Sequence, residues 1–327
     1  MNASATAVLR EFGPADYDGY ITLSNRCYPE YPWSVEEARH DDDIWDHAKH
    51  FKQRIVAEVS GHLVGSGDLH HSRWTFRPDK YWINIKVDPE HRRRGHGSAL
   101  YDALERAARE RGATALQTSA KESLAEGVRF AEGRGFVEVK RDWESRLEVG
   151  GFDFGAFAAA PKRIAEQGIT LTTLATEVAR DREALRRAYE LDVVCAQDVP
   201  SVDPFTPPTF EEWKARVIDA PNALPEAWFL AVAPDGRYLG LSNMFKSLED
   251  PSFIWQGMTG VRREGRGRGI AMALKLETVR YARARRLGHI KTWNDIRNRP
   301  MLRINEALGF VKQPVWVEYQ KELASAT

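Results

Sequence analysis

The early part of the chain carries three stretches with the polar and apolar pattern of β-strands. Residues 54–59 (RIVAEV) and 62–69 (HLVGSGDL) are rich in apolar side chains and are separated by Ser60-Gly61, a tight-turn pair. Residues 82–87 (WINIKV) place an aliphatic side chain at every second position. Because successive side chains of a strand point to opposite faces, this alternation predicts a third strand.

The pattern then changes to the period of a helix. Leu100, Leu104 and Ala107 or Ala108 fall on one stripe of a helix that begins after Gly97. Gly112 predicts the end of this helix. Residues 115–119 (ALQTS) predict the strand that follows it.

The second half of the chain repeats this order of elements. The predicted strands are 229–233 (FLAVA), 238–245 (YLGLSNMF), 253–261 (FIWQGMTGV) and 289–293 (HIKTW). Before the last of them comes a helix that carries Met272, Leu276 and Val279 and ends near Gly288. Strands followed by a helix and another strand predict an α/β (α+β) fold with helices packed on the sheet.

One shift in numbering superimposes the two halves. The differences 261 − 87, 269 − 95 and 274 − 100 all equal 174, and the pair Gly135-Phe136 matches Gly309-Phe310 at the same shift. We therefore predict a tandem duplication of one fold of about 150 residues. The predicted domains are residues 1–149 and 169–327, with 150–168 as a linker.

Composition narrows the classes of protein. The 327 residues include 47 Lys plus Arg and 47 Asp plus Glu, so the net charge is zero, which argues against a dedicated nucleic-acid or membrane partner. Two cysteines exclude a disulfide framework, and no run of 18 apolar residues occurs. The N-terminal residues lack the pattern of a secretory leader. We expect a cytoplasmic protein with no metal site, and the sequence leaves its oligomeric state open.

A loop rich in arginine and glycine follows a strand that ends in valine, once in each half. An amphipathic helix begins directly after each loop, so several backbone N–H groups and the positive end of a helix dipole point into one small volume. This arrangement predicts an anion site, and its presence in both halves favours that function over a solvated arginine turn. The loop is neither a dinucleotide-binding GxGxxG sequence nor a P-loop.

These loops resemble the acetyl-CoA pyrophosphate loop of the GNAT N-acetyltransferase superfamily. The matching residues are Arg92-x-x-Gly95-x-Gly97 and Arg266-x-x-Gly269-x-Ala271, and each loop precedes a Gly-Phe pair by the same interval, since 136 − 95 and 310 − 269 both equal 41. The resemblance covers nearly the whole chain twice. It implies two tandem GNAT-like domains, each with a mixed, splayed central sheet and helices on both faces, and acetyl-CoA as the co-substrate.

The resemblance also implies which residues hold acetyl-CoA. Backbone amides would bind the pyrophosphate, namely those of Arg93, Arg94, Gly95, His96 and Gly97 in the first copy and of Gly267, Arg268, Gly269, Ile270 and Ala271 in the second. The backbone of Val87 or Val261 would pair with the pantetheine arm. The side chains of Arg92 and Arg266 would add positive charge.

The second copy matches the family pattern better than the first. Many members have a Tyr four residues before the Gly of the Gly-Phe pair as the acid that protonates the leaving thiol, and here that position is Ala131 in the first copy and Asn305 in the second. Asn298 matches an asparagine that contacts the cofactor, where the first copy has Leu124. We therefore expect catalysis in the second copy, with Asn305 as a candidate catalytic residue.

No carboxylate stands on the strand before the second loop, where the family usually has its base. Asp295 is the first candidate, and Asp198 and Asp203 in a proline-rich loop are alternatives. The predicted reaction is acetyl transfer from acetyl-CoA to a primary amine of a small molecule or of an aminoacyl or peptide acceptor, by direct attack. The alternative is a non-catalytic acyl-CoA-binding or scaffolding protein with a degenerate tandem fold. The identity of the acceptor is not predicted.

Overall fold

The computed structural model describes residues 7–324, which form two compact units. Unit 1 comprises the chain through Arg141, the segment Val202–Thr206 and the segment from Trp316 onward. Unit 2 comprises Asp142–Ser201 and Pro207–Val315. The predicted domains 1–149 and 169–327 remain a description of the repeat in sequence, because each compact unit also takes in a segment from the other half.

Both units alternate strands and helices as the hydrophobic pattern predicts. The elements before the predicted linker are β1 (Val8–Glu11), α1 (Tyr17–Cys27), α2 (Val35–Asp43), β2 (Lys52–Val59), β3 (His62–His70), β4 (Lys80–Val87), α3 (His96–Glu110), β5 (Ala115–Lys121), α4 (Ala125–Glu132) and β6 (Val137–Glu148). Those after it are α5 (Ala159–Ala165), β7 (Thr170–Thr173), α6 (Leu174–Arg180), α7 (Ala184–Ala196), α8 (Phe210–Val217), β8 (Ala223–Val232), β9 (Tyr238–Lys246), β10 (Phe253–Val261), α9 (Ile270–Ala284), β11 (His289–Asp295), α10 (Arg299–Ala307), β12 (Val311–Lys312) and β13 (Trp316–Glu322).

Each unit is built on a mixed sheet with the same strand arrangement. In unit 1 the order is β1-β2-β3-β4-β5-β13, and in unit 2 the order is β7-β8-β9-β10-β11-β6, with the short β12 also paired to β6. The only parallel pair in each described sheet is the one that flanks the long helix, β4 with β5 and β10 with β11. A parallel pair needs a crossover connection, and α3 and α9 supply it.

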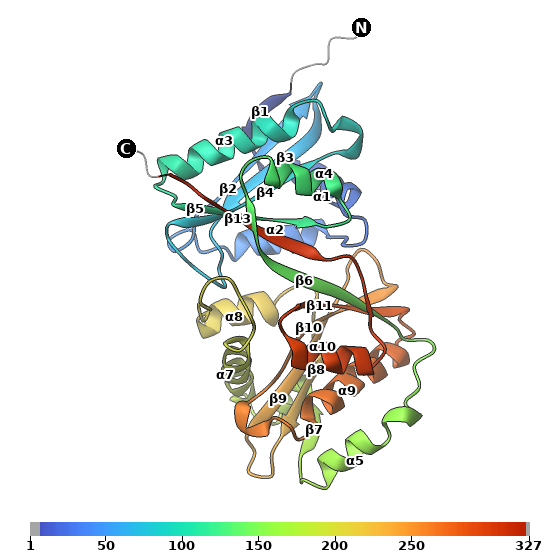
Figure 1. Ribbon diagram of the computed structural model, residues 1–327. Coiled ribbons are helices and arrows are strands. Elements are labelled where there is room, and N and C mark those ends of the chain that lie inside the picture. The colour runs from blue at the N-terminus through green and yellow to red at the C-terminus, as the bar shows by residue number, and fades with distance from the viewer. Residues whose placement is uncertain (1–6, 325–327) are drawn as a thin grey trace. The chain divides into compact units, whose positions relative to one another are not determined.

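The last strand of each repeat pairs inside the other unit. The second part of β6 runs antiparallel to β11, with Asp142 opposite Asp295, and β13 runs antiparallel to β5, with Trp316 opposite Lys121. The two registers are equivalent, since 316 − 142 and 295 − 121 both equal 174. In Figure 1 the exchange is visible as green β6 beside the orange and red strands of unit 2, and as red β13 beside β5. The repeats have therefore exchanged their terminal strands.

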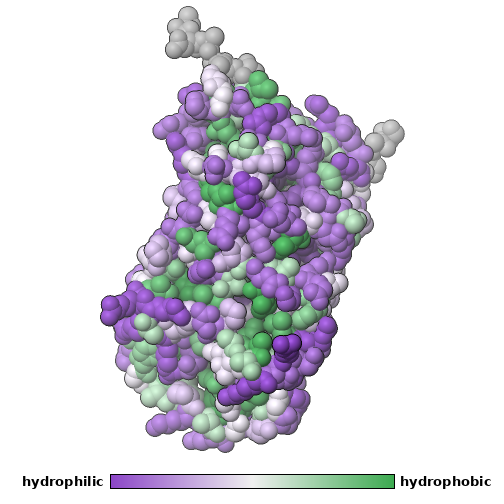
Figure 2. All heavy atoms as spheres, turned by 180° about the vertical axis from the view of Figure 1, so that it is seen from behind, coloured by the Kyte–Doolittle hydropathy of each residue, from purple (hydrophilic) through white to green (hydrophobic). Residues whose placement is uncertain are grey.

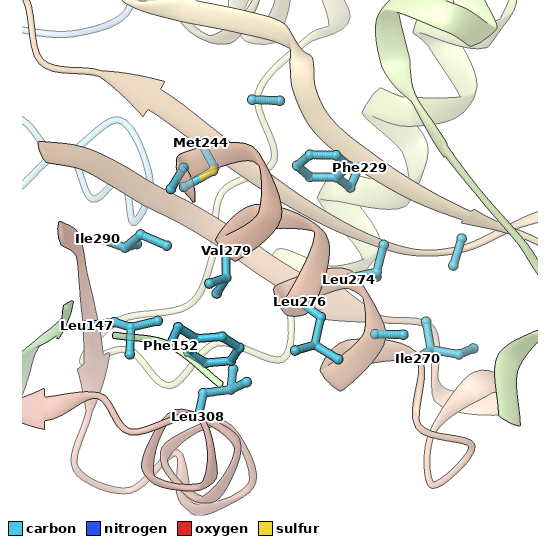
Figure 3. Packing of buried hydrophobic residues seen from close by; sticks show 14 of the residues in the cluster. Leu147, Phe152, Phe229, Met244, Ile270, Leu274, Leu276, Val279, Ile290 and Leu308 are labelled. Carbon is cyan, nitrogen blue, oxygen red and sulfur yellow. The ribbon is translucent and has the colours of Figure 1, made fainter. Parts of the chain in front are cut away.

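The exchanged strand supplies part of the core of unit 2. Leu147 on β6 is buried, and it packs in one apolar cluster with Val279 on α9 and Ile290 on β11, as Figure 3 shows. Phe152, just after β6, joins the same cluster. Burying each such side chain contributes about 1.5–3 kcal/mol, so this core depends on residues from the first repeat.

The predicted linker is folded onto unit 2. Ile164 on α5 is buried in the same core cluster, and the rings of Phe152 and Phe157 stack with centroids 5.4 Å apart. The Arg283 guanidinium on α9 donates to the carbonyl oxygens of Val149 and Phe152 at 3.3 Å. Residues 150–168 are therefore part of the structure around α9.

Polar side chains predominate on one face of the molecule (Figure 2). Figure 2 shows one face with hydrophilic side chains predominating and apolar ones interspersed. Within residues 7–324, no helix combines the length and the apolar character that crossing a membrane would need.

Candidate functional site

In both units the parallel strands pair only at their beginning. β4 pairs with β5 over Lys80–Trp82, and β10 pairs with β11 over Phe253–Trp255. Each of these strands continues beyond its paired residues. The later backbone groups therefore lack a partner on the neighbouring parallel strand, which is where an extended ligand arm could add its own hydrogen bonds.

Unit 2 has a feature in β10 that unit 1 lacks in β4. β10 carries one extra residue between Gln256 and Thr259 relative to β9, a β-bulge. A Cβ atom on Gly257 would lie 2.5 Å from Oδ1 of Asn243 and 2.6 Å from the ring of Phe245, so glycine is required there. Bulges bend a strand and free backbone groups from the ladder.

The bulge also explains a change in the repeat interval. Lys80 and Phe253 begin the parallel pairing in the two units and are 173 residues apart, whereas Val87 and Val261 end the same strands and are 174 apart. The extra residue lies between these points. In unit 1 the described register between β3 and β4 runs unbroken from Trp82 to Val87.

The two arginine and glycine loops have the same backbone shape. Gly95 and Gly269 precede their helices with φ values of 87° and 88°, in the left-handed region. No side chain caps α3 or α9 among the described residues, and the first helical amides that bond to the turn are those of Ala99 and Ala273. The preceding amides of each loop are thus oriented as donors for an anion at a helix N-terminus.

The first arginine of each loop forms a hydrogen bond to the strand residue at which the loop begins. Arg92 Nε donates to the carbonyl oxygen of Val87 at 3.2 Å, and Arg266 Nε donates to that of Val261 at 3.1 Å. The bonds are equivalent in the two repeats. These arginines therefore fix the turn between strand and helix in addition to adding charge near it.

The surroundings of the two loops differ. In unit 2, Arg163 on α5 donates to the carbonyl oxygen of Gly267 at 2.9 Å and lies 3.6 Å from where a Cβ on Gly269 would be. Gln167 donates to the carbonyl oxygen of Arg268 and accepts from its Nε at 2.7 Å. In unit 1, nothing lies within 4 Å of the Cβ position of Gly95. The folded linker thus adds a cation beside the second loop only.

In unit 1 the helices after the loop are packed together by aromatic side chains. The Phe130 ring on α4 lies 3.5 Å from the Cβ position of Gly97 on α3. Tyr101, one turn further along α3, has its ring 6.2 Å from that of Phe130 and 6.1 Å from that of Phe136. The space between α3 and α4 is therefore lined by apolar rings.

In unit 2 the equivalent region has a buried amide side chain, that of Asn305. Asn305 on α10 is 1% exposed and its Nδ2 donates to Oδ1 of Asn294 on β11 at 2.7 Å. Oδ1 of Asn305 is buried without a partner, so it is available to accept a hydrogen bond from a ligand. Asn298 accepts from the Met301 amide at 3.4 Å and so caps the start of α10.

A second buried polar cluster lies where β10 reaches the bulge. Lys275 on α9 is 1% exposed and its Nζ donates to Oε1 of Gln256 at 2.9 Å. Gln256 Nε2 donates in turn to the hydroxyls of Ser242 and Thr259, at 2.9 and 3.1 Å. Burial lowers the pKa of the Lys275 ammonium to about 7. No sequence pattern indicates this cluster, because Lys275 lies within an apolar helical pattern.

Comparisons with known proteins agree with this geometry. The family model described as the acetyltransferase (GNAT) family matches residues 18–136. The mycothiol acetyltransferase of Thermomonospora curvata is 31% identical over 237 residues, which are 72% of each chain. The chain belongs to the GNAT acetyltransferase family. It is a GNAT-type N-acetyltransferase, and members of this family generally use acetyl-CoA.

Other relatives and solved structures support the tandem GNAT layout. The mycothiol acetyltransferase of Thermobifida fusca is 28% identical over 242 residues, 69% of this chain and 70% of the relative. A tandem GNAT protein from the clavulanic acid biosynthesis pathway superimposes with a TM-score of 0.75 at 20% identity, over 98% of this chain and 100% of that one. A GCN5-related N-acetyltransferase from Sphaerobacter thermophilus gives 0.68 at 22% identity, over 97% and 95%. The tandem GNAT fold predicted from the sequence is confirmed.

The candidate carboxylates of this GNAT protein are all engaged with cations. Asp295 is 4% exposed and is paired through both oxygens with Arg297, at 2.7 and 3.0 Å. Asp198 pairs with Arg263 at 2.6 Å and with Arg266 of the unit 2 loop. Asp203 lies in unit 1. These contacts stabilise turns and loops, and Asp295 as a catalytic base stays a prediction.

The third candidate carboxylate, Asp203, lies in unit 1 although its loop belongs to the second half of the sequence. From the sequence, Asp203 is an alternative candidate base for the second copy, but Val202–Thr206 belongs to unit 1. There the Asp203 carboxylate accepts from Lys80 Nζ at 2.5 Å, and both side chains are buried. The sequence of this proline-rich loop gives no indication of the contact between Asp203 and Lys80.

Proposed function

We propose that this protein transfers the acetyl group of acetyl-CoA to a primary amine of a small molecule or of an aminoacyl or peptide acceptor, by direct attack, and that unit 2 performs the reaction. The observation that supports this proposal is that unit 2 combines three features along one strand, the loop that follows it and the next helix. These are the bulge in β10, the partial pairing of β10 with β11, and the N-terminus of α9, which no described side chain caps.

The residues of unit 2 fit an anionic cofactor with an extended arm. The amides of Gly267, Arg268, Gly269, Ile270 and Ala271 would hold the pyrophosphate, with added charge from Arg163 and Arg268. The backbone of β10 up to Val261 would pair with the pantetheine amides. The buried Oδ1 of Asn305 would accept a hydrogen bond from the arm, and Asn298 would contact it at the start of α10.

Unit 1 has the loop and the partial strand pairing without the bulge. The residues that would bind acetyl-CoA there are Val87, Arg92, Arg93, Arg94, Gly95, His96 and Gly97. Phe130 packs against Gly97 on the side where the arm would run. We propose that unit 1 is a structural lobe and that any acetyl-CoA it binds is not turned over.

The attacking amine must be neutral. A lysine-like amine with a pKa near 10.4 requires about 4.6 kcal/mol to lose its proton at pH 7, a cost that lowers the rate unless the site or solvent water removes the proton. Because Asp295 and Asp198 each hold an arginine, we propose that the proton leaves through water. Backbone N–H groups at the bulge would stabilise the negative charge that develops on the thioester oxygen.

For the acceptor, we propose a small polar molecule with a primary amine, because the relatives are mycothiol acetyltransferases. Trp293 on β11 is 37% exposed, and its ring stacks on that of Trp255 at 5.0 Å and 30°. The parallel pairing of these two strands ends at Trp255, just before the bulge. The indole pair offers a flat apolar surface against which an acceptor could pack.

The experiment is calorimetry with acetyl-CoA followed by a CoA-release assay with an amine panel. The panel contains the amine acceptor of the mycothiol acetyltransferase reaction, amino sugars, free amino acids, dipeptides and polyamines. We expect micromolar binding and CoA release with at least one amine. Absence of acetyl-CoA binding would refute the proposal, and binding without CoA release across the panel would instead support a non-catalytic acyl-CoA-binding protein.

A further inference from the structure

Lys275 is an unusual residue for a protein interior. It is 1% exposed, and its described polar contact is the hydrogen bond from Nζ to the neutral side chain of Gln256. The ring of Phe310 lies 4.9 Å from Nζ. Burying an ammonium group without a carboxylate is costly, so an amine held in this way loses its proton at a lower pH than an exposed lysine does.

The position of Lys275 follows the expected path of the cofactor arm. Ala271, in the anion-binding loop, lies four residues earlier on α9 and therefore on the same helix stripe. Gln256, which accepts from Lys275, is the last residue of β10 to pair before the bulge. Phe310 lies just beyond α10, which ends at Ala307. Lys275 thus lies among α9, the end of α10 and the bulged strand.

The residue at the equivalent position in unit 1 supports this placement of Lys275 independently. Tyr101 stands 174 residues before Lys275, and its ring contacts Phe130 on α4 and Phe136 after α4. Gly97, on the same stripe, also meets Phe130. The stripe that carries Tyr101 therefore faces the space between the two helices, and by the repeat the stripe that carries Lys275 faces the equivalent space in unit 2.

The reaction needs a proton at this place. When the acceptor amine attacks the acetyl carbonyl, the C–S bond breaks and its electron pair goes to sulfur. Many members of the family protonate the sulfur with a tyrosine, but here that position holds Asn305, whose amide group cannot release a proton at neutral pH and whose Nδ2 is engaged with Asn294. A different proton donor is therefore required.

We propose that Lys275 is the proton donor to the leaving thiolate of CoA in unit 2, an assignment that rests on the function proposed above. The Lys275 ammonium gives its proton to sulfur, which leaves as the CoA thiol, and Lys275 becomes a neutral amine. The proton lost from the new amide nitrogen passes to solvent, and a proton from solvent restores the ammonium. Reactants and products balance without any further co-reactant.

The acidity of Lys275 suits this role. Its pKa is about 7, and a thiol similar to cysteine has a pKa of about 8.5, so transfer to the thiolate is favourable by roughly 30-fold. Burial is the one cause of the shift. No influence on this amine comes from the described charged or titratable groups on the elements that pack against α9, namely Lys162, Arg163, Glu226, Tyr238, Lys246, His289, Lys291 and Asp295.

The test compares Lys275→Met with Tyr101→Phe, the variant at the equivalent position of unit 1. Each protein is assayed with acetyl-CoA and the most reactive amine of the panel from pH 5.5 to 9.5. Rates are divided by the fraction of acceptor present as free amine. We expect wild-type and Tyr101→Phe proteins to lose corrected activity above about pH 7, as Lys275 loses its proton.

Lys275→Met should lower kcat by about 100-fold or more, and its corrected rate should not fall above pH 7. Its affinity for acetyl-CoA in calorimetry should remain within about threefold of wild type. If kcat and the pH profile are unchanged in Lys275→Met, the assignment is wrong while the proposed function stands. If the wild-type protein releases no CoA with any amine, the proposed function itself fails.

The wild-type profile keeps the assignment testable if Lys275→Met does not fold. A corrected rate that stays constant through pH 7 in the wild-type protein would overturn the role of Lys275 without any variant. Lys275→Gln provides a second substitution that keeps a hydrogen-bond donor for Gln256 but has no proton to transfer. It should resemble Lys275→Met in rate and pH profile, and recovery of wild-type behaviour in Lys275→Gln would contradict proton donation.

Discussion

The same pair of positions in the two units shows how differently one fold can be stabilised. In unit 1, Arg54 on β2 stands opposite Asp68 on β3, and in unit 2 Trp228 on β8 stands opposite Asn243 on β9. The first pair is an ion pair at 2.6 Å, and the second is an aromatic residue beside an amide. The backbone arrangement persists although the side chains have changed from charged to uncharged.

The surroundings of each pair have changed with it. Arg54 also reaches Asp42 at 2.9 Å, and its guanidinium lies 4.3 Å from the ring of Tyr20. Trp228 packs instead against Trp213, with ring centroids 5.5 Å apart, inside an apolar cluster. This face of unit 1 is thus a network of charges, whereas the equivalent face of unit 2 is an aromatic core. Duplication preserved the strand ladder and allowed each interior to be rebuilt.

Breaking the charged network should have the largest effect on stability. Arg54→Met removes the ion pair of the buried Asp68 carboxylate and one of the two cations that pair with Asp42, so we expect a loss of about 3–5 kcal/mol in the free energy of unfolding. Trp228→Phe in unit 2 removes only part of a ring and should cost about 1 kcal/mol. Urea unfolding monitored by circular dichroism measures both, and equal losses would contradict the difference between the two faces.

The roles of the two loops can be distinguished by making the same substitution in each loop. Gly269→Glu places a negative charge at the anion site of unit 2, and we expect acetyl-CoA affinity there to fall by about 100-fold, or about 2.7 kcal/mol, with loss of turnover. Gly95→Glu imposes the same backbone strain at φ 87° and should leave most of the turnover. Calorimetry and the CoA-release assay check both. The reverse ranking would move the reaction to unit 1.

The contributions of buried and partly buried carboxylates to stability should also depend on pH in opposite ways in the two units. In unit 1, burial raises the pKa of Asp42, but its pairs with Lys52 and Arg54 outweigh burial and hold that pKa below its usual value. This contribution to stability is present above pH 4 and is lost as pH falls through the lowered pKa. In unit 2, burial raises the pKa of Asp192 to about 6, against a hydrogen bond from Trp213. That contribution is lost as pH rises through 6.

Asp192→Asn should therefore gain stability relative to wild type as pH rises. From the pKa of about 6, we expect the difference in unfolding free energy to change by about 2 kcal/mol between pH 4.5 and 7.5. Urea unfolding at the two pH values is the measurement. Asp42→Asn serves as the comparison, because removing a group with a lowered pKa should instead cost more at pH 7.5 than near pH 3. A pH-independent difference for Asp192→Asn would show that this carboxyl is not protonated in the native state.

The smallest expected effect tests the folded linker. Arg163→Ala removes the cation beside the unit 2 loop and should weaken acetyl-CoA binding by about fivefold, near 1 kcal/mol, with a smaller loss at high salt. Lys162→Ala, the neighbouring exposed residue on α5, is the matched control and should change affinity by less than twofold. Equal effects in calorimetry would indicate general electrostatic attraction instead of a contact made by Arg163.

The repeat and its loops could be predicted because they depend on local chemistry. The strand 253–261 and the turns at Gly95 and Gly269 follow from side-chain alternation and from glycine conformations, which act over a few residues. The strand exchange could not be predicted. β6 and β13 are equivalent strands of the repeat, so either could pair with β5 or with β11, and the pattern of one strand does not specify its neighbour.

The candidate site, like the fold, could be predicted only where it depends on local sequence. The cofactor loop has a sequence signature, but Lys275 and Gln256 meet only because α9 packs on β10, and their sequence separation gives no sign of it. Arg163 was assigned to a linker, where nothing in the sequence connects it with Gly267. Pairings of this kind depend on tertiary packing, which a single sequence does not reveal.

The exchanged strands also set the order in which the protein can mature during synthesis. β5 ends at Lys121, whereas its partner β13 begins only at Trp316, so the whole intervening chain must be made before the two strands can pair. The nascent first repeat must therefore wait, with one sheet edge unpaired, until β13 has been made. The second repeat carries β13, so the pairing of β13 with β5 is the step that closes unit 1.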